Sequence, residues 1–131
     1  MRNLLIILFI LLTFPSAVFS TQNRVALVIG NGSYSNGPLR NPVNDARLMS
    51  NLLRKAGFSV TVVENARKRE LVSAIRNFGN TIKNSDAALF YFSGHGNQHN
   101  GQNWLIPIGA DIQRESDLEF EAVNAERVLA E

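Results

Sequence analysis

The stretch AALFYFSGHG, residues 87–96, is an apolar and aromatic run that ends at a histidine between two glycines. A run of this length without polar alternation is typical of a strand buried on both faces, as in a parallel sheet covered by helices. His95 would then follow the carboxyl end of a central strand, the edge at which open α/β sheets bind ligands. Gly94 and Gly96 allow a sharp turn and leave backbone N–H groups free beside the imidazole.

Further apolar and amphipathic stretches surround this run. We predict parallel strands at residues 25–29, 59–63 and 87–92, and helices at residues 42–56 and 68–83, where apolar residues recur every three or four positions. Successive β-α-β units with right-handed crossovers place the strands in one parallel sheet and the helices on its faces. The predicted fold class is therefore α/β.

Residues suited to helix ends mark where these helices begin and stop. The candidates are Asn41 and Pro42 before the first helix, Gly57 after it, and Asn65 before the second. Downstream, the dipeptide Asn100-Gly101 predicts a β-hairpin. A further helix is expected within residues 121–131, with Val123 and Val128 as core residues.

The composition limits the classes of function. With 131 residues the chain is one domain at most, and 45% hydrophobic residues suffice for a packed core. The net charge is only +2, and the densest basic cluster, residues 67–69, is typical of a solvated helix start. No nucleic-acid partner is therefore expected. The sequence contains no cysteine, which excludes a disulfide, a thiolate metal site and a cysteine nucleophile within these residues.

Residues 1–20 have the features of a signal peptide. Arg2 is followed by an apolar run over residues 4–14, and the small residues Val18 and Ser20 suit cleavage after Ser20. The alternative is an uncleaved membrane anchor, but the apolar run is shorter than the roughly 20 residues that a bilayer span needs. We expect an exported protein, periplasmic or secreted, that begins at Thr21 and has no stable membrane span after cleavage.

His95 has two readings on physical grounds alone. A histidine at a strand–loop junction can be structural, with its ring bonded to a carbonyl. A general base, however, must reach both a nucleophile and a substrate, and it gains from flanking glycines and from nearby N–H groups that can stabilise an oxyanion. His99 lies close by, but no third ligand stands at a metal-like spacing, so no metal site is expected.

A second glycine motif follows the first predicted strand. Gly30-Asn31-Gly32 lacks the third glycine of a dinucleotide fingerprint, and the next helix begins too late to offer its N-terminus to a pyrophosphate. Binding of a nucleotide or flavin therefore stays a weaker alternative.

Five motifs together resemble one known family. They are RVALVIGN at residues 24–31, NPVNDAR at 41–47, AGF at 56–58, LFYFSGHG at 89–96 and WLIP at 104–107. In this order and spacing they resemble the caspase-like fold, specifically the bacterial metacaspase-type branch of peptidase family C14. The likeness covers residues 24–131. It implies a caspase-like three-layer α/β/α sandwich with a mostly parallel sheet, here the N-terminal, large-subunit portion and incomplete at its C-terminus.

The resemblance implies roles for four residues. His95 matches the histidine of the catalytic Cys–His dyad, and Gly96 matches the glycine whose backbone N–H helps to bind the oxyanion. Asp45 and Ser93 match positions that line the pocket for the residue before the scissile bond. A carboxylate there favours Arg or Lys. Asp45 could instead be a charge that stabilises the first turn of its helix.

The resemblance also exposes a missing group. The family's nucleophile is a cysteine at the end of the next strand, and this chain contains no cysteine. An imidazole without a thiol cannot carry out acylation. We therefore expect either a truncated part of a cysteine endopeptidase, inactive alone, or a catalytically inactive caspase-like module that binds peptides or partner domains. Peptide or protein substrates are implied and no cofactor is; no stretch has the spacing of a calcium-binding loop.

Overall fold

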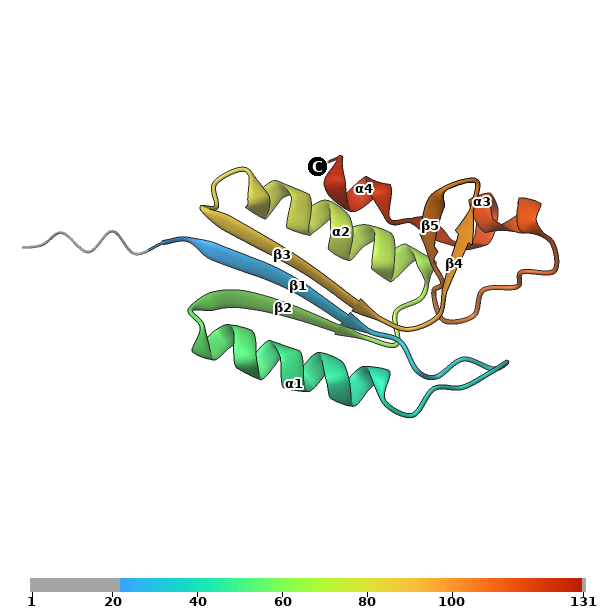
Figure 1. Ribbon diagram of the computed structural model, residues 1–131, viewed down its shortest axis with the longest axis horizontal. Coiled ribbons are helices and arrows are strands. Elements are labelled where there is room, and N and C mark those ends of the chain that lie inside the picture. The colour runs from blue at the N-terminus through green and yellow to red at the C-terminus, as the bar shows by residue number, and fades with distance from the viewer. Residues whose placement is uncertain (1–21, 131) are drawn as a thin grey trace, which may run out of the picture.

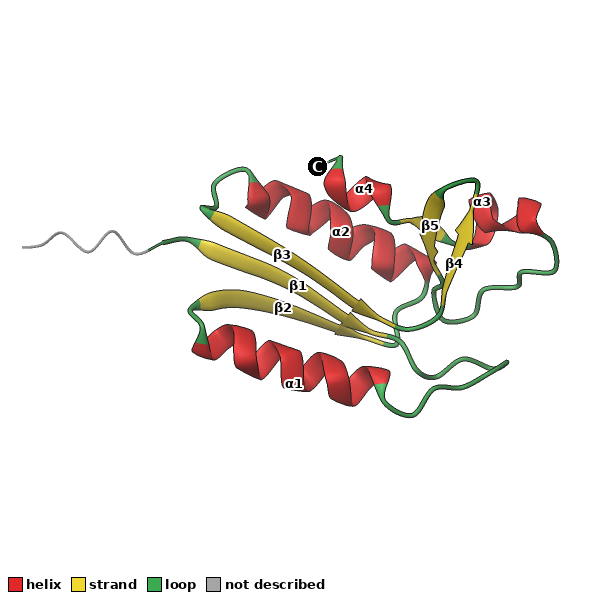
Figure 2. Cartoon of the chain, viewed as in Figure 1, coloured by secondary structure: helices red, strands yellow, loops and turns green. Residues whose placement is uncertain are grey.

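The computed structural model describes residues 22–130, in which a parallel sheet lies between two helices (Figures 1 and 2). The strands are β1 (Arg24–Gly30), β2 (Phe58–Glu64) and β3 (Ala87–Ser93), in the order β2-β1-β3. Helix α1 (Pro42–Lys55) covers one face and α2 (Lys68–Ile82) the other. The predicted α/β class is confirmed, and each of these elements ends within one residue of its predicted bounds. The signal peptide expected at residues 1–20 lies outside the described residues.

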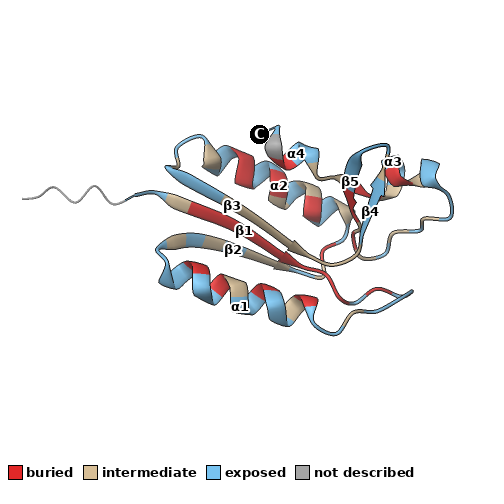
Figure 3. Ribbon diagram, viewed as in Figure 1, coloured by how far each residue is buried: buried red, intermediate tan, exposed pale blue. Residues whose placement is uncertain are grey.

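Strand β1 is the centre of the sheet because it pairs with a parallel strand on each side. Its alternate side chains enter two different cores. Val25, Leu27 and Ile29 pack with α2, whereas Ala26 and Val28 pack with α1. Figure 3 shows this strand as the main buried band of the sheet.

Strand β3 is not the central strand that its apolar run predicted. It pairs with β1 alone, and within residues 22–130 no strand lies against its other edge. Both of its faces do contact a helical layer, with Leu89 and Tyr91 on the α1 side and Phe90 and Phe92 on the α2 side. The open edge nevertheless leaves the strand only partly buried. The prediction that helices cover both faces of this strand is confirmed, whereas the prediction that it is the central strand of the sheet is wrong.

The helix ends differ in part from those expected. Gly57 ends α1 with a φ of +85°, as predicted. Asn41 occupies the N-cap position of α1 but makes no capping hydrogen bond with its side chain. Asn65 does not cap α2: Arg67 is the N-cap residue, and its N–H donates to the Glu70 carboxylate at 2.8 Å.

A second, smaller sheet follows β3. The strands β4 (Gly96–His99) and β5 (Gln102–Leu105) form the expected hairpin, and its turn residues Asn100 and Gly101 have φ values of +50° and +75°. The remaining elements are a 3-10 turn η1 (Glu115–Asp117), α3 (Leu118–Glu121), β6 (Val123–Asn124) and α4 (Glu126–Leu129).

The single helix expected within residues 121–131 is therefore wrong. Val123 pairs with Leu105 of β5, so strand pairing interrupts the helix and separates α3 from α4. Val123 and Val128 are both buried, as predicted. None of the helices in residues 22–130 is long and apolar enough to cross a membrane.

Candidate active site

The candidate residues gather at the carboxyl end of the large sheet. Gly30 ends β1 beside Ser93, which ends β3, and the next N–H, that of Asn31, donates to the Ser93 carbonyl at 2.8 Å. Helix α1 approaches this end so closely that a Cβ on Gly30 would lie 2.4 Å from the Pro42 carbonyl oxygen. A larger residue would force the helix away from the strand. The loop from β1 to α1 therefore starts directly beside the segment that carries His95.

His95 is held by that loop at two points. Its Nε2 lies 2.6 Å from the Gly37 carbonyl oxygen, and its backbone N–H donates to the Tyr34 hydroxyl at 3.0 Å. The rings of Tyr34 and His95 are 4.5 Å apart at an angle of 52°. A carbonyl oxygen can only accept, so in this contact Nε2 carries the proton. In the neutral ring, Nδ1 then keeps the lone pair and is the atom able to act as a base.

Two glycines make this arrangement possible. A Cβ on Gly94 would lie 2.7 Å from the Tyr34 hydroxyl and 2.8 Å from the Phe92 ring. Gly37 has a φ of +68°, and a Cβ there would lie 3.3 Å from Nε2 of His95. The glycine before His95 is thus required for packing.

Gly96 lies at the start of the hairpin with its N–H directed away from β5. Antiparallel pairs alternate between hydrogen-bonded and non-hydrogen-bonded positions. Ile106 N–H donates to the His95 carbonyl at 3.0 Å, so the next pair, Gly96 with Leu105, is a non-hydrogen-bonded one. The Gly96 N–H is therefore not used by the hairpin ladder.

Asp45 and Ser93 lie on the same corner of the molecule. Ser93 and Gly30 are register partners and share a face of the sheet, and the open side of Gly30 faces α1. On α1, Asp45 and Arg47 flank the buried Ala46 on opposite sides.

The neighbours of Arg47 show which flank faces which strand. Arg47 donates to the Glu64 carboxylate, at the end of β2, at 2.6 Å, so its flank faces β2. The Asp45 flank therefore faces β3, where Ser93 lies. Asp45 is exposed and takes part in none of the ion pairs among the described residues.

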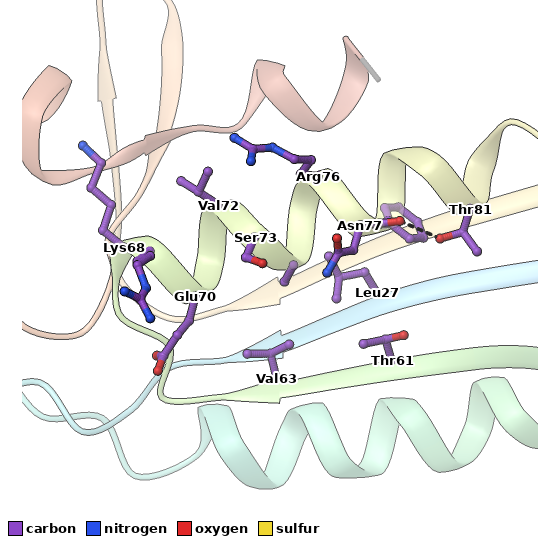
Figure 4. A pocket seen from close by; sticks show the side chains of 13 residues that line it. Leu27, Thr61, Val63, Lys68, Glu70, Val72, Ser73, Arg76, Asn77 and Thr81 are labelled. Atoms are coloured by element: carbon purple, nitrogen blue, oxygen red, sulfur yellow. Dashed lines mark hydrogen bonds between the residues drawn. The ribbon is translucent and has the colours of Figure 1, made fainter.

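A small hollow of about 150 Å³ opens beside His95. Its lining comes from the β1–α1 loop and from the segment after β5: Tyr34, Ser35, Asn36, His95, Ile106, Gly109, Ala110 and Ile112. A much larger groove of about 960 Å³ runs between α2 and β2 (Figure 4). None of the four candidate residues lines that groove. Across residues 22–130, no three His, Asp or Glu side chains come close enough together to hold a metal ion.

Sequence reasoning missed the residues that hold the site together. Tyr34 and Gly37 fix His95, and burial raises the pKa of the Tyr34 hydroxyl, which stays protonated at neutral pH. Asn31, fully buried, accepts from Ala66 N–H at 2.8 Å and donates to the Ala66 carbonyl at 3.2 Å. Asn65 accepts the N–H groups of Gly32 and Ser33. The glycine motif at residues 30–32 was the sequence signal that could have indicated these contacts, because it lies where the loop after β1 packs against the loop after β2.

Comparison with known proteins agrees with this fold. The model of the caspase domain family matches residues 23–130. The mucosa-associated lymphoid tissue lymphoma translocation protein 1 homolog of Mus musculus is 32% identical over 90 residues, which cover 68% of this chain and 11% of that protein. The mucosa-associated lymphoid tissue lymphoma translocation protein 1 of Homo sapiens is 31% identical over 90 residues, which cover 68% of this chain and 11% of that protein.

A third relative comes from a nematode. Cell death protein 3 of Caenorhabditis remanei is 30% identical over 94 residues, which cover 71% of this chain and 17% of that protein. The chain thus spans less than a fifth of the length of each of these relatives. With the fold and the family match in agreement, the chain belongs to the caspase domain family, peptidase C14.

Proposed function

We propose that this chain is the histidine-bearing part of an exported cysteine endopeptidase of the metacaspase type. The observation that carries the proposal is the state of His95. Its Nε2 is occupied by the Gly37 carbonyl, and its Nδ1 is left as the basic atom at the carboxyl end of the sheet. A base held in one tautomer is what a thiol nucleophile requires.

The residues present would carry out every step except the nucleophilic attack. Nδ1 of His95 takes the proton from a thiol and later returns it to the leaving amine. The N–H of Gly96, free of the hairpin ladder, donates to the oxyanion. The thiol is not among these 131 residues, so another segment of the protein must supply it. The thiolate attacks the scissile carbonyl, and loss of the protonated amine breaks the peptide bond and leaves a thioester. Water then hydrolyses this thioester to the carboxylic acid and regenerates the thiol, and no cofactor takes part.

Asp45 and Ser93 support a preference for Arg, then Lys, before the scissile bond. The carboxylate lies on the β3 flank of α1, on the same corner as Ser93. A guanidinium can bind a carboxylate through two parallel hydrogen bonds. Such charged contacts contribute about 1.5–3 kcal/mol, which corresponds to roughly ten- to more than a hundredfold discrimination. An Asp in the same pocket would bring two carboxylates together and is expected to be refused.

A non-catalytic binding module is the alternative that one observation favours. The sequence contains no cysteine, so these 131 residues by themselves lack the nucleophile. In that case the site would hold peptides or a partner domain without cleaving them.

The test is to read the coding DNA beyond Glu131 and to assay the longer product. We expect an in-frame strand that ends in a cysteine, labelling by thiol-alkylating agents, and cleavage of fluorogenic peptides after Arg. The 131-residue chain should neither cleave nor be labelled. In the longer protein, His95→Ala should abolish turnover, and Asp45→Ala should remove the preference for Arg. A longer reading frame without a cysteine would support the binding module instead.

Export is tested separately. Mass spectrometry of the expressed protein should find an N-terminus at Thr21 in the exported fraction. An intact Met1 in the cytoplasm would contradict the signal peptide.

A further inference from the structure

A tyrosine hydroxyl is inserted into the first rung of the small sheet. In a hydrogen-bonded antiparallel pair, the two residues exchange two N–H···O bonds. His95 and Ile106 make one of these directly, from Ile106 N–H to the His95 carbonyl at 3.0 Å. The other is bridged: His95 N–H donates to the Tyr34 hydroxyl at 3.0 Å, and that hydroxyl donates to the Ile106 carbonyl at 2.8 Å.

The inserted hydroxyl is buried and closely surrounded. Tyr34 is only 7% exposed, although its neighbours Ser33 and Ser35 are exposed. Its oxygen occupies the space that a side chain at position 94 would need. A buried hydroxyl is costly unless both its donor and acceptor capacities are used, and here both are.

These contacts control the direction in which the imidazole points. The bridged rung fixes the backbone of His95, and the centroid of the Tyr34 ring lies 4.5 Å from that of the imidazole. At the far end of the imidazole, Nε2 donates to the Gly37 carbonyl. Since Tyr34 and Gly37 belong to one loop, that loop holds His95 at its backbone, its ring face and its Nε2.

We propose that Tyr34 is a positioning residue for His95, which through its hydroxyl keeps the imidazole in the tautomer that leaves Nδ1 basic. The use of that tautomer in catalysis rests on the proposed function; the positioning itself does not. Without the hydroxyl, His95 N–H and the Ile106 carbonyl lose their shared partner. The rung must then close directly or open to water, and either change moves Nε2 relative to Gly37.

The experiment is nitrogen NMR of the imidazole rings in the 131-residue chain, which has only two histidines and two tyrosines. In the wild type, His95 should show the single tautomer protonated at Nε2. Tyr34→Phe should convert this signal to a mixture of tautomers. Tyr91→Phe is the matched control, because Tyr91 packs on the α1 side of β3, and it should leave the tautomer of His95 unchanged. An unchanged tautomer in folded Tyr34→Phe would overturn the proposal.

The wild-type chain supplies a second measurement in case Tyr34→Phe does not fold. The hydroxyl proton of Tyr34 and the amide proton of His95 should both exchange slowly with water, because each is buried in the bridged rung. Rapid exchange of either proton would overturn the proposal.

Failure of the positioning and failure of the proposed function give different results. In a longer protein that contains the thiol, Tyr34→Phe should lower kcat roughly tenfold and leave KM nearly unchanged, since a small displacement of a base is costly. A longer protein without peptidase activity would refute the endopeptidase and leave the NMR result standing. If the longer protein is an active protease and Tyr34→Phe changes neither its kcat nor the tautomer of His95, only the positioning role of Tyr34 is refuted.

Discussion

β1 and β3 are strands of similar apolar character in one sheet, yet their burial differs. Leu27, Val28 and Ile29 of β1 are each 0% exposed, whereas no residue of β3 is fully buried. Both strands lie between the same two helical layers. The difference arises because β1 pairs with a strand on both sides, whereas β3, among residues 22–130, pairs with a strand on one side only. An apolar run therefore predicts that the two faces of a strand are covered, and it does not predict whether its edges are paired.

This difference shapes the candidate site. β3 leads directly into His95, so the histidine stands at the border of the described sheet. On the β1 side, Tyr34 and Gly37 hold it by hydrogen bonds. On the other side the edge of β3 is open, and in the proposed enzyme the thiol must approach from a segment outside this chain.

Amide hydrogen exchange gives the largest test of this comparison. Ser93 directs its carbonyl toward β1, where it accepts from Asn31, and alternate residues of a strand point to opposite edges. The amides of Leu89 and Tyr91 should therefore be protected, whereas those of Phe90 and Phe92 should exchange at least roughly a hundredfold faster. Equal protection of all four would show that something covers the open edge of β3.

Matched truncations test the same difference in free energy. Leu27→Ala in β1 should lower the free energy of unfolding by about 2–5 kcal/mol, because it leaves a cavity among fully buried residues. Leu89→Ala in β3 should cost about 1–2 kcal/mol, because part of that side chain is already in water. Urea denaturation followed by circular dichroism measures both. Equal losses would mean that β3 is as buried as β1.

The carboxyl end of β1 offers a polar counterpart. Asn31→Ala removes both hydrogen bonds to the backbone of Ala66 and leaves the Ala66 N–H unpaired, whereas the Ala66 carbonyl still accepts from Ile108 N–H at 2.8 Å. We expect a loss of about 1–3 kcal/mol in the free energy of unfolding, which is the cost of one orphaned buried group. Asn51→Ala, at an exposed position of α1, is the control and should change stability little. A loss no larger than that of the control would contradict the role of Asn31.

The smallest effect concerns β2, the other edge strand. The hydrogen bond from Arg47 lowers the pKa of Glu64 and raises that of Arg47. Arg47→Ala should move the pKa of Glu64 back toward its ordinary value, and Arg54→Ala should not. A lowered folded pKa contributes stability above the ordinary value and loses it as the pH falls through the folded one. The wild type and Arg47→Ala should therefore converge in stability in acid. NMR titration of the Glu64 carboxyl carbon measures the shift of its pKa.

Local patterns account for most of the fold and less of its arrangement. Apolar spacing and turn residues located the three long strands and two long helices to within one residue. They could not show the edge position of β3, because no local pattern encodes a neighbouring strand. They also failed at residues 121–131, where pairing of Val123 with Leu105 outweighed helical spacing.

The candidate site divides in the same way. His95, Gly96, Asp45 and Ser93 could be named from motifs, and the structure brings them to one end of the sheet. Their roles stay predictions. Tyr34 was invisible from the sequence because its partner His95 is 61 residues away. The buried contacts of Asn31 and Asn65 likewise span loops far apart in the chain.

The buried phenol of Tyr34 has a consequence in alkaline solution. Because burial raises its pKa, the folded chain favours the neutral hydroxyl. Its contribution to stability is complete below the ordinary pKa of tyrosine and is lost as the pH rises through the higher, folded value. A phenolate can no longer donate to the Ile106 carbonyl, so ionisation would break the bridged rung. The alkaline limit of an ordered His95 is therefore set by the ionisation of a tyrosine.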